Sequence, residues 1–96
     1  MKVFAIASIP QGVTKEQIRQ LLPKEVQATL KHYLEGKIEQ FWFRENAGPI
    51  FLMNAESVEQ AKAALDTLPL VAAKLMTYEV MPVTTLTPFG LLIQEK

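Results

Sequence analysis

The sequence predicts a single α+β domain with the βαββαβ order of a ferredoxin-like fold, in which a four-stranded antiparallel sheet carries two helices on one face. Three observations lead to this prediction. The chain has 96 residues, enough for one hydrophobic core. Two segments open with the Ser/Thr-x-x-Gln pattern of a helix capping box. Four apolar or aromatic segments have the length of strands and are bounded by turn residues.

The first strand and the first helix follow from the amino-terminal third of the chain. Residues 3–9 are β-branched, aromatic or small, and both alternating sets are apolar, which predicts a strand covered on both faces. Thr14 and Gln17 form the first capping box, so we expect the helix to begin at Thr14, and Gly36 is placed to end it. Pro23 removes a backbone donor inside this helix, which predicts either a kink or a second helical segment that begins there.

A hairpin and a second capped helix form the centre of the chain. Residues 37–44 are rich in aromatic side chains and predict a strand, and residues 46–49 supply an Asn, a Gly and a Pro for a reversal. Residues 50–53 form a short apolar run, typical of a strand buried on both faces. Ser57 and Gln60 match the second capping box, in which Gln60 reaches back to the Ser57 amide.

The second helix is expected to be short, because Pro69 stops it near Leu68. Its inner stripe consists of Val58, Ala61, Leu65 and Leu68. Residues 75–81 then predict the fourth strand, and we expect Pro82 to end it.

Two helices on one face leave the other face of an apolar sheet without cover. Such a face is large enough to mark an interaction surface. We therefore expect a homodimer, with the extension to a higher homo-oligomer left open, in which two sheets pack face to face. Residues 1–83 would form the domain, and the apolar residues 84–96 an arm that packs on the partner subunit. A monomer whose tail folds back is the alternative.

Composition excludes several functions. Ten basic and ten acidic residues cancel, so we expect no nucleic-acid partner. No apolar run is long enough to cross a bilayer, so we expect no membrane partner. The absence of Cys favours a cytoplasmic location. The single His and the absence of Cys argue against a metal site, and no Gly-rich phosphate loop is present, so we expect no cofactor.

The chain resembles the muconolactone delta-isomerase family of the dimeric α/β-barrel superfamily. The residues that carry the resemblance are Trp42 and Arg44 before a Gly-containing turn, Ser57-Val58-Glu59 and Leu65 with Leu68-Pro69-Leu70 in the second helix, and Glu35-Gly36 after the first. The resemblance implies a dimeric α/β barrel that isomerises a small unsaturated lactone by moving a proton. It carries a catalytic role to Glu25 and a substrate-binding role to Lys24. Pro23 and the apolar tail depart from the family pattern.

Glu25, Thr29 and His32 lie at positions i, i+4 and i+7, along one edge of the apolar stripe of the first helix. A carboxyl and an imidazole on this line would point into the same cleft, and such a pair suits proton transfer near neutral pH. We therefore name Glu25 and His32 as candidate catalytic residues. The structural alternative is that the edge of a helix stripe is half-exposed and polar by default.

The strand at residues 37–44 supplies two further candidates. Trp42 and Arg44 are expected to share one face with Ile38, and Phe41 and Phe43 to lie in the core on the other face. In a pocket, Arg44 would orient an anionic group and Trp42 would pack on the substrate. The alternative is an ordinary core with an Arg that extends to solvent.

Tyr78, in the fourth strand, is the last candidate. It would either end in the pocket with its hydroxyl or pack only its ring. Together these features predict a protein that binds a small, mostly apolar organic molecule, carboxylated or a lactone, and that isomerises it if it is an enzyme. The alternatives are a non-catalytic small-molecule-binding or assembly module and a cofactor-independent monooxygenase.

Overall fold

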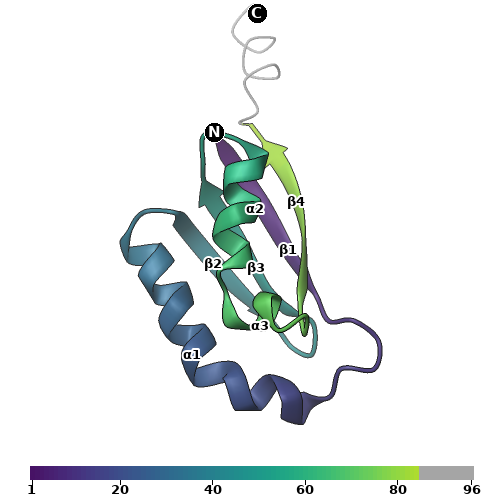
Figure 1. Ribbon diagram of the computed structural model, residues 1–96. Helices are drawn as coiled ribbons and strands as arrows, with labels where there is room; N and C mark the ends of the chain where they lie inside the picture. The colour runs from purple at the N-terminus through teal and green to yellow at the C-terminus, as the bar shows by residue number, and fades with distance from the viewer. Residues whose placement is uncertain (85–96) are drawn as a thin grey trace, which may run out of the picture.

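The computed structural model describes residues 1–84 (Figure 1). In chain order the elements are β1 (Lys2–Ser8), α1 (Lys15–Leu34), β2 (Ile38–Arg44), β3 (Gly48–Asn54), α2 (Val58–Asp66), α3 (Pro69–Ala72) and β4 (Thr77–Val83). The four strands form one antiparallel sheet in the order β2-β3-β1-β4. The predicted ferredoxin-like α+β fold is therefore confirmed, and α3 is an addition to it.

The helix caps explain where α1 and α2 begin. The Thr14 side chain accepts a hydrogen bond from the Gln17 amide, and the Gln17 side chain accepts one from the Thr14 amide, as predicted. Ser57 caps α2 in the same way, but the Gln60 side chain accepts from the Glu56 amide, one residue before the predicted partner. Local sequence therefore fixes both starting points.

Three prolines lie inside or at the ends of helices and strands, and two of them do not act as the sequence predicts. Pro23 lies inside a continuous α1, whose axis changes direction partway along the helix in Figure 1, so the kink is the correct alternative. Pro69 does not simply end α2, since it occupies the first turn of α3. The prediction that Pro82 ends the last strand is wrong, because β4 continues to Val83. As an edge strand, β4 has one side without a partner strand, where a proline is tolerated.

α2 packs closely on the sheet. It lies across β1 and β3 in Figure 1 and contacts β4. The core cluster that it covers consists of Val3, Ala5, Ile38, Phe51, Met53, Ala61, Leu65 and Leu68. α1 takes a different position, beside β2 and against α3.

The face of the sheet away from the helices is apolar as well. Because Val3, Ala5 and Ala7 are buried on the helix side, the alternate residues of β1 and their cross-strand partners point the other way. The apolar members of this set include Phe4, Ile6, Trp42, Ile50, Leu52 and Met81, and its polar members include Gln40 and Glu79. Trp42 is 45% exposed and meets the Phe4 ring edge-to-face at 6.1 Å. Within residues 1–84 this apolar face has no cover, as predicted; the predicted arm lies almost entirely outside the described residues.

Candidate functional site

A cavity of about 720 Å³ lies between α1 and the sheet. Its apolar lining includes Ile18, Leu22, Val26, Leu30, Phe41, Phe43, Phe51, Leu70 and Met76. The prediction that Phe41 and Phe43 are core residues is wrong, since Phe43 is 76% exposed and Phe41 is also exposed. Both rings lie on the side of β2 that α1 would cover if it packed as closely as α2 does. The space left by α1 makes them walls of a cavity.

A β-bulge decides which side chains of β2 reach this cavity. The register shifts between Ile38 and Gln40, which pair with the neighbouring residues Met53 and Leu52 of β3. Ile38 is therefore buried on the helix side, and the prediction that it shares a face with Trp42 is wrong. Trp42 points to the open face of the sheet and does not line the cavity, so the structure separates it from the other candidates.

Glu25 is the buried carboxyl of the cavity. Its side chain comes from the middle of α1, and its Oε1 accepts a hydrogen bond of 2.9 Å from the Leu70 amide. Leu70 belongs to the first turn of α3, where the N-cap residue Leu68 makes no side-chain cap, so Glu25 satisfies an amide that would otherwise lack a partner. Burial raises the pKa of Glu25 above its usual value, and the Leu70 hydrogen bond opposes that rise. Glu25 can therefore hold a proton closer to neutral pH than an exposed glutamate.

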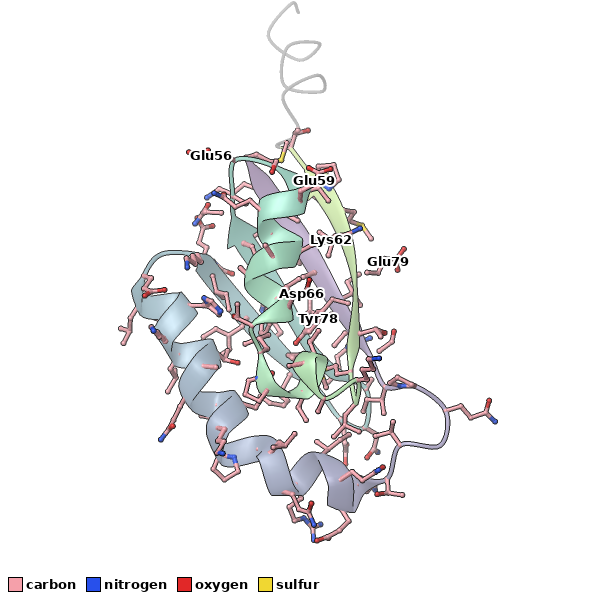
Figure 2. All side chains as sticks on the ribbon, viewed as in Figure 1. Glu56, Glu59, Lys62, Asp66, Tyr78 and Glu79 are labelled. Carbon is pink, nitrogen blue, oxygen red and sulfur yellow. The ribbon has the colours of Figure 1, made fainter. Side chains whose placement is uncertain are left out.

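Tyr78 packs against the cluster that contains Leu70, whose amide Glu25 binds, but it does not line the cavity. Its ring stacks on Phe51 with the ring centroids 5.5 Å apart, and its buried hydroxyl has no hydrogen-bond partner among residues 1–84. Burial and the nearby Glu25 charge raise the pKa of this hydroxyl. Figure 2 shows Tyr78 leaving β4 toward the helices and Glu79 leaving it away from them.

Arg44 provides a fixed positive charge at the cavity. Its Nη2 donates to the carbonyls of Ala7 at 2.6 Å and Ala47 at 3.0 Å, and its Nε donates to the Gly48 carbonyl at 3.2 Å. In the described part of the chain no acidic side chain forms an ion pair with Arg44. Carbonyl groups position the guanidinium without cancelling its charge, so it can attract an anionic group in the cavity.

His32 lies in a different pocket, of about 380 Å³. Its Nε2 is 2.9 Å from the Thr67 hydroxyl, which itself donates to the Ala64 carbonyl, so Nε2 carries the proton of the neutral ring. Nδ1 is buried and lies 4.0 Å from Glu35 Oε1, and it has no hydrogen-bond partner in the part of the chain that the structure describes. Burial lowers the pKa of His32. The expectation that Glu25 and His32 share one cleft is wrong, because the middle of α1 faces α3 whereas its last turn faces the end of α2.

The remaining predicted residue, Lys24, is exposed and does not line the cavity. Lys15 and Arg19 line it instead, together with Glu45. Sequence reasoning also missed the Leu70 amide, for which no side-chain signal exists, since the partner is a backbone group 45 positions from Glu25. Among residues 1–84 no group of three His, Cys, Asp or Glu side chains is placed to hold a metal ion, and none of the helices there is long and apolar enough to span a membrane.

Comparisons with known proteins agree with this architecture at the level of the fold. No protein-family model matches the chain, and no curated protein matches it. Among solved structures, muconolactone isomerase superposes with a TM-score of 0.69 and 20% identity over 88% of this chain and 90% of the other. A 5-chloro-2-hydroxyhydroquinone dehydrochlorinase from Burkholderia phenoliruptrix AC1100, solved with 2,5-dihydroxybenzoquinone, superposes with a TM-score of 0.73 and 15% identity over 92% and 98%.

These identities are low, so the likeness concerns the course of the backbone. Both matches cover nearly the whole of each chain. The resemblance predicted from the sequence is thereby confirmed for the fold: this chain has the α+β fold of muconolactone isomerase and of the dehydrochlorinase.

Proposed function

We propose that the cavity between α1 and the sheet binds a small, mostly apolar molecule that carries an anionic group, and that Glu25 moves a proton on it. The observation that carries the proposal is a buried carboxyl with a raised pKa in an apolar cavity that also contains an Arg without an acidic partner. Proton-transfer enzymes use such a combination, because the carboxyl exchanges a proton near neutral pH and the cation holds the substrate.

The proposed reaction is isomerisation of an unsaturated lactone. The Glu25 carboxylate takes a proton from a carbon of the conjugated system, the electron pair of that C–H bond moves into the ring system, and the resulting enolate carries the charge. The same proton then returns from Glu25 to another carbon, so the double bond moves and no atom is gained or lost. Arg44 would hold the substrate carboxylate, and the apolar walls would keep water away from the charged intermediate.

The two solved structures with this fold support the substrate class. One is named an isomerase of muconolactone and the other a dehydrochlorinase of a chlorinated hydroquinone, solved with a dihydroxybenzoquinone. A lactone, a hydroquinone and a benzoquinone are all small oxygen-bearing rings. A cavity of about 720 Å³ is in the range of small-molecule sites.

The proposal includes a homodimer in which the open faces of two sheets pack together. The support is the row of half-buried apolar side chains on that face, together with the exposed Trp42. Residues 84–96 are proposed to pack on the partner subunit. Light scattering on the full chain and on a chain that ends at Val83 tests both points: a dimer that is lost on truncation supports the arm, and a monomeric full chain contradicts the dimer.

The decisive experiment compares two glutamates of the same cavity. Glu25→Gln keeps the acceptor for the Leu70 amide but cannot take a proton, so turnover of an unsaturated lactone with a carboxylate should fall about a hundred- to ten-thousandfold. Glu45→Gln is the matched control, because Glu45 also lines the cavity but is exposed, and its turnover should change less than about twofold. Equal turnover in both variants would refute the role of Glu25.

A non-catalytic binding module is the second candidate, and one observation favours it. Glu25 caps the amide of Leu70 at the start of α3, which gives the buried carboxyl a structural reason to be there. Under this alternative the unmutated protein binds the lactone, detected by calorimetry, and does not turn it over.

A further inference from the structure

Among residues 1–84, no atom accepts a hydrogen bond from the buried hydroxyl of Tyr78. A buried polar group that forms no hydrogen bond lowers the stability of a protein, so such groups are rare and call for an explanation. The ring of Tyr78 is held by its stacking on Phe51, and the strand that carries it is paired with β1 along its length. The hydroxyl is therefore kept in place by its ring and its backbone, and not by a partner of its own.

The Glu25 carboxyl is the candidate acceptor for this hydroxyl. One of its oxygens, Oε1, accepts from the Leu70 amide, and no hydrogen bond occupies the other within the described residues. Tyr78 packs against the cluster of Ala7, Leu70 and Met76, and Glu25 accepts its hydrogen bond from the Leu70 amide, so both side chains lie beside this cluster. The Glu25 charge also adds to the rise in the pKa of the Tyr78 hydroxyl that burial causes. A protonated carboxyl already has an acceptor oxygen, but an ionised carboxylate accepts hydrogen bonds more strongly, so ionisation of Glu25 provides the stronger acceptor for the Tyr78 hydroxyl.

We infer that Tyr78 is a positioning residue whose hydroxyl donates to the Glu25 carboxylate when that group loses its proton, and that it does not contact the bound molecule. This inference rests on the proposed function for its consequence in turnover, but not for the contact itself. Two donors, the Leu70 amide and the Tyr78 hydroxyl, then stabilise the ionised form of Glu25 against burial. Tyr78 thereby keeps the pKa of Glu25 low enough for the carboxylate to form near neutral pH.

The chain contains a matched control for this role. It has two tyrosines, and Tyr33 is exposed on α1, with its ring edge-to-face against Phe41. Tyr33→Phe removes a hydroxyl from the same residue type without touching Glu25. Tyr78→Phe keeps the stacking ring on Phe51, so it removes the donor and leaves the packing in place.

The test is a carbon-13 NMR titration of the glutamate side-chain carboxyls, with the Glu25 signal assigned by its loss in Glu25→Gln. Tyr78→Phe should raise the pKa of Glu25 by about half a unit to one unit, the value of one hydrogen bond to the charged form, and Tyr33→Phe should leave it unchanged. An identical Glu25 titration in Tyr78→Phe and the unmutated protein would overturn the inference.

A second measurement needs no variant. With the tyrosine Cζ atoms labelled in the unmutated protein, the Tyr78 signal should shift with the midpoint of the Glu25 titration, and a flat Tyr78 signal would overturn the inference. In turnover, the pH at which Tyr78→Phe reaches half of its maximal rate should rise by the same amount as the Glu25 pKa, with KM unchanged. A raised KM without that pH shift would mean that Tyr78 contacts the substrate. Turnover that survives in Glu25→Gln would refute the proposed function and leave the NMR result standing.

Discussion

The two long helices lie on the same face of the sheet but use it differently. α2 buries Ala61 and Leu65 in the core that contains Val3 and Phe51. α1 leaves Leu30 44% exposed and stands over a cavity. One half of the face is therefore closely packed, and the other half borders a cavity. The difference shows that a helix can belong to the fold without filling the core beneath it.

Polar anchors explain how α1 keeps this position. Glu25 bonds the Leu70 amide of α3, and His32 bonds the hydroxyl of Thr67 at the end of α2. Both contacts attach α1 to the segment that joins α2 to β4, and neither attaches it to the sheet. α1 contains Pro23 and bends partway along its length in Figure 1, so the two halves of the helix point in different directions. Glu25 therefore has two roles. It supplies the carboxyl of the cavity, and its hydrogen bond attaches α1 to α3.

The largest expected effect is a difference in the free energy of unfolding between substitutions in α2 and substitutions in α1. Leu65→Ala removes a side chain from the close-packed half and should lower the free energy of unfolding by about 2–5 kcal/mol. Leu30→Ala, at a half-exposed position of α1 that lines the cavity, should lower it by less than about 1 kcal/mol. Urea unfolding followed by circular dichroism measures both. Equal losses would mean that α1 packs on the sheet as closely as α2.

The next effect concerns binding in the loosely packed half. Arg44→Met removes the guanidinium at the cavity and should raise the KM for an anionic lactone about ten- to a hundredfold, the value of a charge-assisted hydrogen-bonded contact. Arg19→Met is the control, because Arg19 lines the same cavity but is exposed and pairs with Glu16, and its KM should change less than about threefold. If both substitutions raise KM equally, Arg44 does not bind the anionic group specifically and contributes only to the overall positive charge of the cavity.

The smallest effect concerns the anchor at the end of α1. Burial lowers the pKa of His32 below its value in the unfolded chain, so the neutral ring contributes stability above about pH 6.5, and this contribution is lost as the pH falls through the lowered pKa. His32→Gln retains a donor for Thr67 and does not titrate. The unmutated protein should therefore lose stability below pH 6.5 more steeply than the variant in unfolding series at several pH values. Parallel curves would contradict burial of the neutral imidazole.

Local signals explain what the sequence predicted well. The capping boxes at Thr14 and Ser57 and the alternation of the strands are encoded within a few residues, so the element order and the fold follow from them. Non-local geometry explains the errors. The β-bulge after Ile38 moves the following side chains of β2 to the opposite face of the sheet, and no glycine or proline at the bulge marks it in the sequence. Phe43 lines a cavity because α1 does not pack closely on this part of β2.

The candidate site was predicted in part for the same reason. Glu25 and Arg44 were named from the sequence, and both line the cavity. His32 lies on nearly the same line of α1 as Glu25, yet the two side chains meet different elements, because a bent helix crosses from α3 to α2. The position of a residue in a helix predicts the side on which its side chain lies. The element that the side chain meets there depends on the tertiary fold.

The measurement that tests this account most directly is an NMR map of where an unsaturated, carboxylate-bearing lactone binds. The account predicts that the backbone amides of Leu70, Phe41 and Phe43 shift on addition of the lactone, and that Glu25→Gln and Arg44→Met reduce those shifts. Shifts confined to the open face of the sheet, at Phe4 and Leu52, or to the core beneath α2, would contradict it.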